Sequence, residues 1–412
     1  MPISLDKFIL RRVPALISTF VLLSVVVVLS SCGDTYRPIV TPILQPGGDP
    51  QATHYAIVVN ANNGQPTDLN TGVGPSASQF DVSGDTNMGN RRTGINPVQA
   101  VVTTSFLAFV LNQGDSSVTS FGLLVSNPTI STVFLEPNAD ASHMDAVGST
   151  AFVSETALNR VAVVDSNLPG AKSYLDVGPA PGVLAVTPNG SKVYVGNTGD
   201  GTLSVISVKD NAVLSSPIAI GGVPVSMAVQ SSSTYVFVVN SSGGAFSVID
   251  TSTDKEVQRF SGLSNPTQVV WDDSLQRVYV LNSGSNSINV YNGAAPSLQL
   301  LRTVPLSGSP IGLAALDSGS KFYVLYGGNP GHVDVFNTQS FQRTSTVTVQ
   351  NNPVYIAAAP GSTKVYVTNK NGDSGSASPQ NPNGSVSIIK TSDDTVLNVG
   401  TGSIQPVFVA TR

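Results

Sequence analysis

Four side chains that could do chemistry lie close together along this sequence. His143 and Asp145 occupy alternate positions of one expected strand, so their side chains point to the same side of a sheet. Glu155 ends the next expected strand, and Arg160 lies in the turn after it. An imidazole, two carboxylates and a guanidinium could together coordinate a cation or assist hydrolysis. The alternative, which we favour, is a polar strand beside one drifted repeat.

Other patterns that would indicate catalysis or a bound cofactor are missing from the sequence. The three histidines, His54, His143 and His332, have no spacing typical of a metal site. No glycine-rich phosphate loop lies between a strand and a helix, and no serine stands in a nucleophile turn. We therefore expect no cofactor, no bound metal and no enzymatic activity.

The single cysteine, Cys32, follows an apolar segment at the start of the chain. Lys7, Arg11 and Arg12 precede this segment, which is the pattern of a secretory signal peptide. The residues "LSSC" at 29–32 resemble the lipobox of bacterial lipoproteins. The resemblance implies cleavage before Cys32 and attachment of lipid to its thiol and amino group. An ordinary signal peptide or an uncleaved membrane helix remains the alternative.

Residues 32–52 are expected to form a tether between lipid and domain. Four prolines recur at every fourth position from Pro38 to Pro50, which favours an extended chain. Removal of residues 1–31 leaves 17 basic and 24 acidic side chains and no basic cluster, so we expect no nucleic-acid partner. The expected location is the cell envelope, at the outer membrane or periplasmic face, with the membrane contacted through the N-terminal lipid.

The rest of the chain, residues 53–412, repeats one unit. An apolar strand recurs and ends at Asn60, Asn112, Glu155, Asn197, Asn240, Asn282, Tyr326 and Asn369. The spacings are 52, 43, 42, 43, 42, 44 and 43 residues. Each unit contains four segments with β-branched residues and period-2 alternation, separated by turn residues. The pattern predicts an all-β domain of four-stranded units, and the count of units is eight.

Three kinds of segment carry a resemblance to the YVTN family of β-propeller repeats. They are "VYVTN" (365–369), "FSVIDT" (246–251) and "IGGVP" (220–224). The resemblance covers about residues 54–412 and implies a single propeller of four-stranded blades. Eight blades follow from the repeat count, whereas seven are usual for the family. An open-ended solenoid is the structural alternative.

The two ends of the repeat region favour a closed ring. The last residues, "IQPVFVATR" (404–412), match the first strand of a unit, whereas "HYAIVVN" (54–60) matches a second strand. The C-terminal strand should therefore pair with the N-terminal strand and complete a shared blade, which removes a free sheet edge.

The loops give the leading expectation for function. In a propeller of this order, first strands line the channel, and the second-to-third and fourth-to-first loops share one face. Two second-to-third loops are long, after Asn60 and after Asn369, and they become neighbours when the ring closes. Residues 84–94 are expected to lengthen a third-to-fourth connection. The asparagines that end the second strands are expected to bond the backbone of the turn that follows.

We expect a lipid-anchored envelope propeller that binds a protein, a glycan or a cell-wall component through this loop face. One alternative is a lactonase-like or metal-dependent hydrolase with its site in the channel, since related lactonase-type propellers act there through charged residues. The other is a structural protein of the envelope or surface layer.

Overall fold

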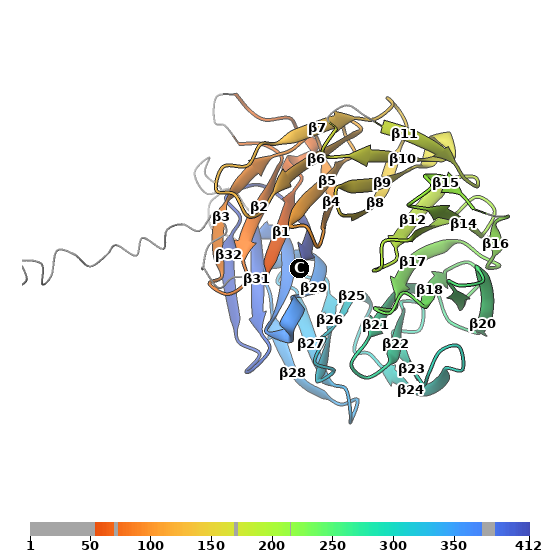
Figure 1. The fold of residues 1–412 in the computed structure, drawn as a ribbon. Coiled ribbons are helices and arrows are strands. Elements are labelled where there is room, and N and C mark those ends of the chain that lie inside the picture. The colour runs from red at the N-terminus through yellow and green to blue at the C-terminus, as the bar shows by residue number, and fades with distance from the viewer. Residues whose placement is uncertain (1–53, 70–72, 169–171, 215, 373–383) are drawn as a thin grey trace, which may run out of the picture. The chain divides into compact units, whose positions relative to one another are not determined.

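The repeat region forms a ring of eight antiparallel sheets in the computed structural model (Figure 1). The structure describes residues 54–69, 73–168, 172–214, 216–372 and 384–412. Each sheet is one blade, so the prediction of an all-β propeller with eight blades is confirmed. The predicted signal segment 1–31, Cys32 as the predicted lipid attachment site and the predicted tether 32–52 lie outside the described residues.

Each blade has a first strand beside the central channel and a fourth strand at the rim. The first strands of blades 1 to 8 are β33 (Pro406–Thr411), β4 (Pro97–Val102), β8 (Ala141–Val147), β12 (Pro181–Val186), β17 (Pro224–Val229), β21 (Pro266–Asp272), β25 (Pro310–Ala315) and β29 (Asn351–Ala358). The second strands are β1 (Tyr55–Asn60), β5 (Leu107–Asn112), β9 (Thr150–Glu155), β13 (Lys192–Asn197), β18 (Tyr235–Asn240), β22 (Arg277–Asn282), β26 (Lys321–Tyr326) and β30 (Lys364–Gly372).

The outer half of each blade completes the repeat. The third strands are β2 (Ser76–Asp81), β6 (Ser117–Gly122), β10 (Arg160–Asp165), β14 (Thr202–Ser207), β19 (Ala245–Asp250), β23 (Ser287–Asn292), β27 (His332–Asn337) and β31 (Ser385–Lys390). The fourth strands are β3 (Thr86–Arg92), β7 (Ser131–Phe134), β11 (Lys172–Asp176), β15 (Ala212–Val213) with β16 (Ile218–Ala219), β20 (Lys255–Ser261), β24 (Gln299–Pro305), β28 (Arg343–Thr348) and β32 (Val396–Gly400). Short 3₁₀ turns are η2 (Asn62–Gly64), η3 (Thr156–Leu158) and η4 (Pro360–Ser362).

The repeat pattern located the second strands correctly, and one expectation about a loop was wrong. All eight predicted strand ends lie in the second strands, and seven of them are the last residue of the strand. Residues 84–94 are no insertion, because most of this segment is β3, the fourth strand of blade 1. Glycine and asparagine in that segment hid the strand, since both are depleted in strands.

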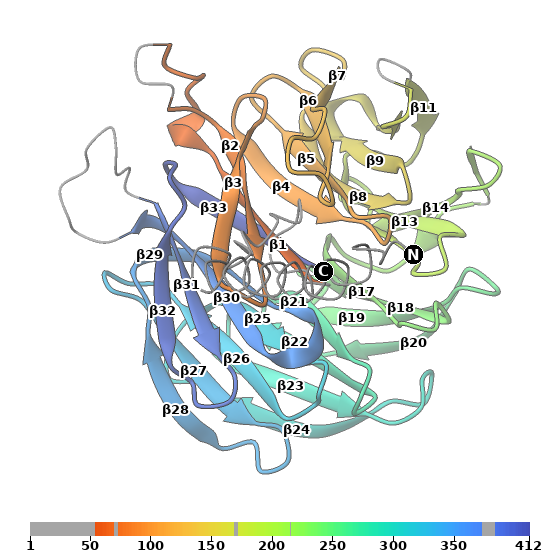
Figure 2. The same ribbon diagram turned by 60° about the vertical axis from the view of Figure 1, so that its left-hand side comes forward.

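The ring closes through the C-terminal strand, as predicted. β33 pairs antiparallel with β1, with Val58 opposite Val409 and Ala56 opposite Thr411 (Figure 2). Blade 1 is therefore built from both ends of the repeat region. Because Val409 is only 1% exposed and packs in one cluster with Ala56 and Val58, closure also buries apolar surface.

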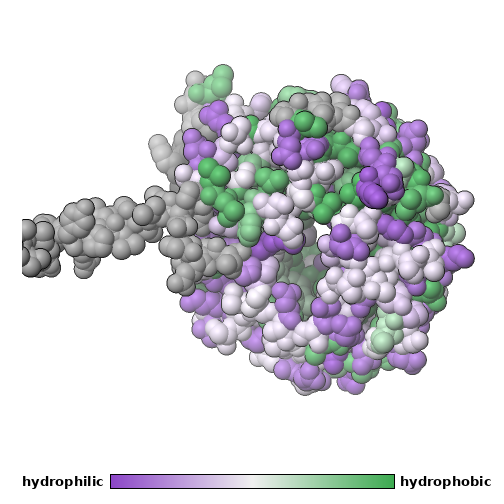
Figure 3. Space-filling model, in the orientation of Figure 1, coloured by the Kyte–Doolittle hydropathy of each residue, from purple (hydrophilic) through white to green (hydrophobic). Residues whose placement is uncertain are grey.

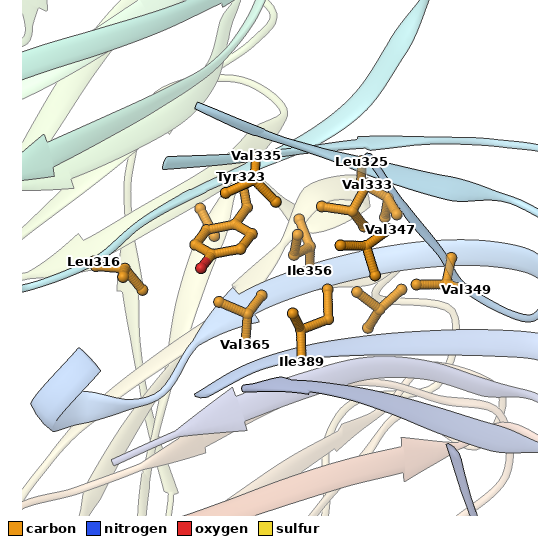
Figure 4. Packing of buried hydrophobic residues seen from close by; sticks show 12 residues of the cluster. Leu316, Tyr323, Leu325, Val333, Val335, Val347, Val349, Ile356, Val365 and Ile389 are labelled. Atoms are coloured by element: carbon orange, nitrogen blue, oxygen red, sulfur yellow. The ribbon is translucent and has the colours of Figure 1, made fainter. Parts of the chain in front are cut away.

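Apolar side chains between neighbouring blades make the core. Along β30, Val365 (Figure 4) and Val367 pack toward blade 7, whereas Tyr366 between them packs toward blade 1. The period-2 alternation of a strand thus supplies both faces of a blade. Each such buried side chain contributes about 1.5–3 kcal/mol through burial of apolar surface.

Lysine–aspartate pairs join blades near the rim. Lys192 of blade 4 donates to Asp254 of blade 5 over 2.7 Å and to the carbonyl of Thr251, also over 2.7 Å. The hydroxyl of Tyr194, two residues on, donates to the same carboxylate. Equivalent pairs are Lys321 with Asp394, from blade 7 to blade 8, and Lys364 with Asp85, from blade 8 to blade 1.

The fourth-to-first and second-to-third loops share one face, which we call the loop face. The backbone N–H groups of Thr198 and Gly199 donate to the carbonyls of Ala180 and Pro179, and blade 1 repeats the pattern. The residue before the first-strand proline has positive φ in several blades, for example 49° at Asn96 and 56° at Gln405. The sharp turn brings each first strand from the loop face into the channel wall.

Candidate functional site

Two hollows on the channel axis and the loop face are candidates for the functional site. The channel opens at the centre of the ring (Figure 3). Inside it lies a cavity of about 460 Å³, which we call the channel cavity. It is lined by Val98, Gln99, Ser142, His143, Val183, Leu184, Val225, Ser226, Met227, Thr267, Gln268, Ile311, Tyr355 and Phe408. All of these residues lie on first strands, as the sequence predicted.

The residue two positions after the proline that begins a first strand often forms hydrogen bonds with the next blade. The amide of Gln99 donates to the carbonyl of Met144 over 2.9 Å and accepts from its N–H over 2.8 Å. Gln268 makes the same two bonds with Leu313 of the next blade. Each amide thus uses one donor and one acceptor position in holding the ring.

His143 and two aromatic side chains line the channel cavity at the same level. The His143 side chain is exposed to the lumen, yet the surrounding strands remove most bulk water and lower its pKa. Tyr355 and Phe408, from blades 8 and 1, lie with ring centroids 4.2 Å apart. Burial raises the pKa of Tyr355 to about 12, so its hydroxyl stays protonated at neutral pH.

Asp145 does not line the channel cavity. Its carboxylate accepts from the N–H of Ala146 over 2.8 Å and from the N–H of Val186, in blade 4, over 2.7 Å. Burial raises its pKa to about 6, and these two hydrogen bonds partly oppose the shift. Asp145 therefore links blades 3 and 4. Gln99 and Gln268 link their blades in the same way, from first-strand positions nearer the loop face.

Glu155 and Arg160 form a pair inside blade 3. The Nε of Arg160 donates to Glu155 over 2.5 Å, and the Glu155 side chain is fully buried. The guanidinium also lies 3.6 Å from the ring centroid of Tyr174. Neither residue lines the channel cavity or is joined to His143 or Asp145 by an ion pair or hydrogen bond among the described residues. The four residues thus divide among three places.

The asparagines at the ends of second strands face the interior of the blades. Asn112 donates to the hydroxyls of Ser117 and Thr119 in the third strand, and Asn197 donates to those of Thr202 and Ser204. The expected bonds to the following turn are replaced in these blades by bonds across the hairpin. In blade 3, the positions of Asn197 and Thr202 are taken by Glu155 and Arg160, so an ion pair replaces the amide–hydroxyl bond.

The second hollow, of about 630 Å³, lies on the loop face where blades 8, 1 and 2 meet. We call it the loop-face hollow; its lining is Ala61, Asn63, Gly64, Ile95, Asn96, Pro97, Val98, Gly114, Lys370, Gln405 and Val407. The loop after β1 contributes Asn63, and the end of β30 contributes Lys370. It adjoins the channel cavity, because Val98 lines both. Residues 373–383 of the second predicted loop lie outside the described residues, so the meeting of the two loops stays a prediction.

Polar groups in the loop-face hollow are available for a ligand. Within the described residues, the side chains of Asn63, Asn96 and Lys370 make no hydrogen bond or ion pair. Gly114 lets the loops approach closely, since a Cβ there would lie 2.8 Å from the side chain of Ile95. Sequence reasoning found the loops but missed Lys370 and Asn96, whose convergence depends on ring closure.

Comparisons with known proteins support the fold but identify no family. No protein-family model and no curated protein matches the chain. Among solved structures, the dihydro-heme d1 dehydrogenase NirN matches with a TM-score of 0.67 and 10% identity, over 87% of this chain and 74% of that one. AztD of Citrobacter koseri matches with a TM-score of 0.63 and 10% identity, over 87% and 97%. A putative 6-phosphogluconolactonase of Bacteroides fragilis matches with a TM-score of 0.58 and 11% identity, over 88% and 98%.

The chain is an eight-blade β-propeller. At such low identity its neighbours define the fold alone, and their differing names agree with the range of activities that propellers support. The described residues contain no cluster of three or more His, Cys, Asp or Glu side chains arranged to hold a metal ion. They also contain no helix long and apolar enough to cross a membrane.

Proposed function

We propose that this protein is a lipid-anchored binding module of the cell envelope. Its loop face, at the loop-face hollow, binds an envelope protein or a cell-wall glycan. The observation that carries the proposal is the convergence of the loop after β1 and the end of β30, from sequentially distant blades 1 and 8, on one hollow with polar side chains. Long loops on a rigid scaffold are common carriers of binding function.

The chemistry of the two hollows favours binding over hydrolysis. Lys370 supplies one cation and Asn63 and Asn96 supply amides, a set suited to carbonyl, hydroxyl or carboxylate groups of a partner. In the channel cavity the titratable side chains among the lining residues are His143 and Tyr355. A hydrolase of the lactonase-like alternative would need an acid–base pair there, and Asp145 is already bonded to backbone N–H groups.

The anchor is a separate part of the proposal. It is supported by the "LSSC" motif behind the basic and apolar segment of residues 7–29. We expect Cys32→Ala to move the protein from the membrane fraction to the soluble fraction. Retention of the variant in membranes after an alkaline wash would contradict the anchor without affecting the loop-face proposal.

Site-specific photocrosslinking in intact cells tests the loop-face proposal. A photoreactive residue at position 370 should give a crosslinked product, and one at position 209, in the exposed third-to-fourth turn of blade 4, should not. A protein partner gives a discrete band, whereas a cell-wall glycan gives a smear that collapses after digestion with a muramidase. Equal products from both positions, or none at position 370, would overturn the proposal.

A further inference from the structure

We propose that the channel cavity is a second binding site, which takes one uncharged ligand of one or two flat rings. This site is distinct from the loop-face hollow and does not depend on the identity of a macromolecular partner. A volume of about 460 Å³ lies within the range of small-molecule pockets and accommodates a compact ligand.

The wall of the channel cavity is uncharged and mixed, with polar and apolar side chains in similar measure. Its apolar side chains include Val98, Val183, Val225, Met227 and Ile311, which come from four different blades. Ile311 is 46% exposed, although large aliphatic side chains usually pack in cores. An apolar ligand in the channel would cover this surface and be stabilised by removal of its own apolar area from water.

The aromatic pair gives the cavity a preferred ligand shape. Tyr355 and Phe408 are 4.2 Å apart between centroids, with an interplanar angle of 33°. Both rings line the cavity and come from the last and first blades, so ring closure creates the pair. A third flat ring placed against them gains offset-stacked or edge-to-face contact beyond its area burial.

The absence of charge in the lining selects against ionic ligands. None of the described residues that line the cavity is Lys, Arg, Asp or Glu. A charged ligand would lose its hydration without gaining an ion pair, which is unfavourable. Desolvation lowers the pKa of His143, which favours its uncharged form.

Uncharged hydrogen-bonding groups from several blades line the cavity. The amides of Gln99 and Gln268 are committed to the next blade. The imidazole of His143 and the hydroxyl of Tyr355 make no hydrogen bond within the described residues. Together with the hydroxyls of Ser142 and Ser226, they can bond uncharged polar substituents on the ring system of the ligand.

Titration with two fluorescent probes tests charge selectivity in the intact protein. N-phenyl-1-naphthylamine is uncharged, and 1-anilinonaphthalene-8-sulfonate has a similar ring system with a negative charge. We expect the first probe to bind at one site with a Kd in the micromolar range and the second to bind at least about tenfold more weakly. No saturable binding of the uncharged probe, or equal affinity for both, would overturn the proposal.

Matched valine-to-tryptophan variants locate the binding. Val183→Trp fills the cavity and should weaken binding of the uncharged probe by about tenfold or more. Val213→Trp makes the same change on the outer strand β15, 36% exposed, and should leave binding unchanged. Unchanged binding in Val183→Trp, with thermal melting that matches the wild type, would place the probe elsewhere and overturn the proposal.

His143→Lys provides a second test of the site, which does not depend on correct folding of Val183→Trp. The added cation should strengthen binding of the sulfonate probe by about tenfold and weaken that of the uncharged probe. No change in either affinity would show that neither probe lies near His143, which would overturn the proposed site. Crosslinking from position 370 is expected to persist in all three variants, so the two proposals can fail separately.

Discussion

Glu155 and Arg160 act as a unit in blade 3. If Glu155 were only a drifted asparagine, Glu155→Asn would be neutral. The structure gives a reason to expect the opposite, because the substitution would leave the largely buried Arg160 without its carboxylate. We expect a loss of about 2–4 kcal/mol in the free energy of unfolding.

The double variant Glu155→Asn/Arg160→Thr is the control for this prediction. It rebuilds the pair seen as Asn197 and Thr202 in blade 4 and should recover at least half of the lost stability. Chemical denaturation of the wild type, both single variants and the double variant gives the coupling energy. Additive losses in the double variant would contradict a coupled pair.

Asp145 should make stability depend on pH. Its folded pKa of about 6 lies above the usual unfolded value, so its stabilising contribution is present at low pH and lost as pH rises through 6. His143 has the opposite sign, because its lowered pKa removes stability as pH falls through the folded value. Arg412 is the charged group that acts on Asp145, and it lowers the carboxyl pKa.

The comparison of wild type with Asp145→Asn isolates the aspartate, since His143 titrates in both proteins. From pH 7.5 to pH 4.5 the wild type should gain about 1–2 kcal/mol relative to the variant, after allowance for water in the channel. Urea denaturation at the two pH values measures this difference. A difference independent of pH would show that Asp145 has an ordinary pKa.

At the residue scale, the sequence predicted the side of a strand on which a side chain lies better than it predicted the contacts of that side chain. Period-2 alternation predicted the same side of the strand for His143 and Asp145, but of these two only His143 lines the channel cavity. It could not place Asp145 against Val186, because that contact depends on how blade 4 is rotated beside blade 3. Nor could it pair Glu155 with Arg160, since the compensating change becomes visible only after the second and third strands are aligned across the hairpin.

The lysine–aspartate pairs between blades are the prediction at the scale of elements. Lys364 is 7% exposed and bonds Asp85 of blade 1, so Lys364→Met leaves a carboxylate poorly compensated at the junction that closes the ring. We expect Lys364→Met and Lys321→Met to lower the free energy of unfolding by about 1–3 kcal/mol each. Lys209→Met, on the exposed turn of blade 4, should change it by less than about 0.5 kcal/mol. A loss in the control equal to that in the paired lysines would show that the pairs have no special role.

Strands were easier to predict than the contacts that order them. The spacing of the apolar segments gave the second strands, because each apolar segment is a local pattern of six or so residues. The rim pairs escaped notice, because Lys192 and Asp254 are 62 residues apart and meet only when adjacent blades stack. A series of separate hairpins and a closed ring of blades differ only in these long-range contacts.

Closure by β33 is the prediction at the scale of the whole molecule. Deletion of residues 405–412 removes this strand, leaves β1 with an unpaired edge and exposes the cluster around Val58. We expect a loss of about 5 kcal/mol or more, or loss of soluble protein, measured by denaturation and limited proteolysis. Arg412→Ala, which keeps the strand, should remain close to the wild type. A truncated protein as stable as the full chain would indicate an array that does not need closure.

The whole-molecule architecture was predictable because it depends on counting. Eight units and a C-terminal first strand led to a ring of eight blades with one shared blade, as the structure has it. The location of the hollows was not predictable in detail. Lys370 and Asn96 converge, and Tyr355 meets Phe408, only because blades 8, 1 and 2 become neighbours on closure.

Hydrogen–deuterium exchange of the protein with and without its purified crosslinking partner tests the central claim most directly. The account predicts slower exchange in the described parts of the loop-face hollow, at residues 61–66, 95–98 and 404–407, and unchanged exchange in the outer strands of blades 4 to 6. Protection confined to those outer strands, with none around the hollow, would contradict the assignment of the loop face as the binding surface.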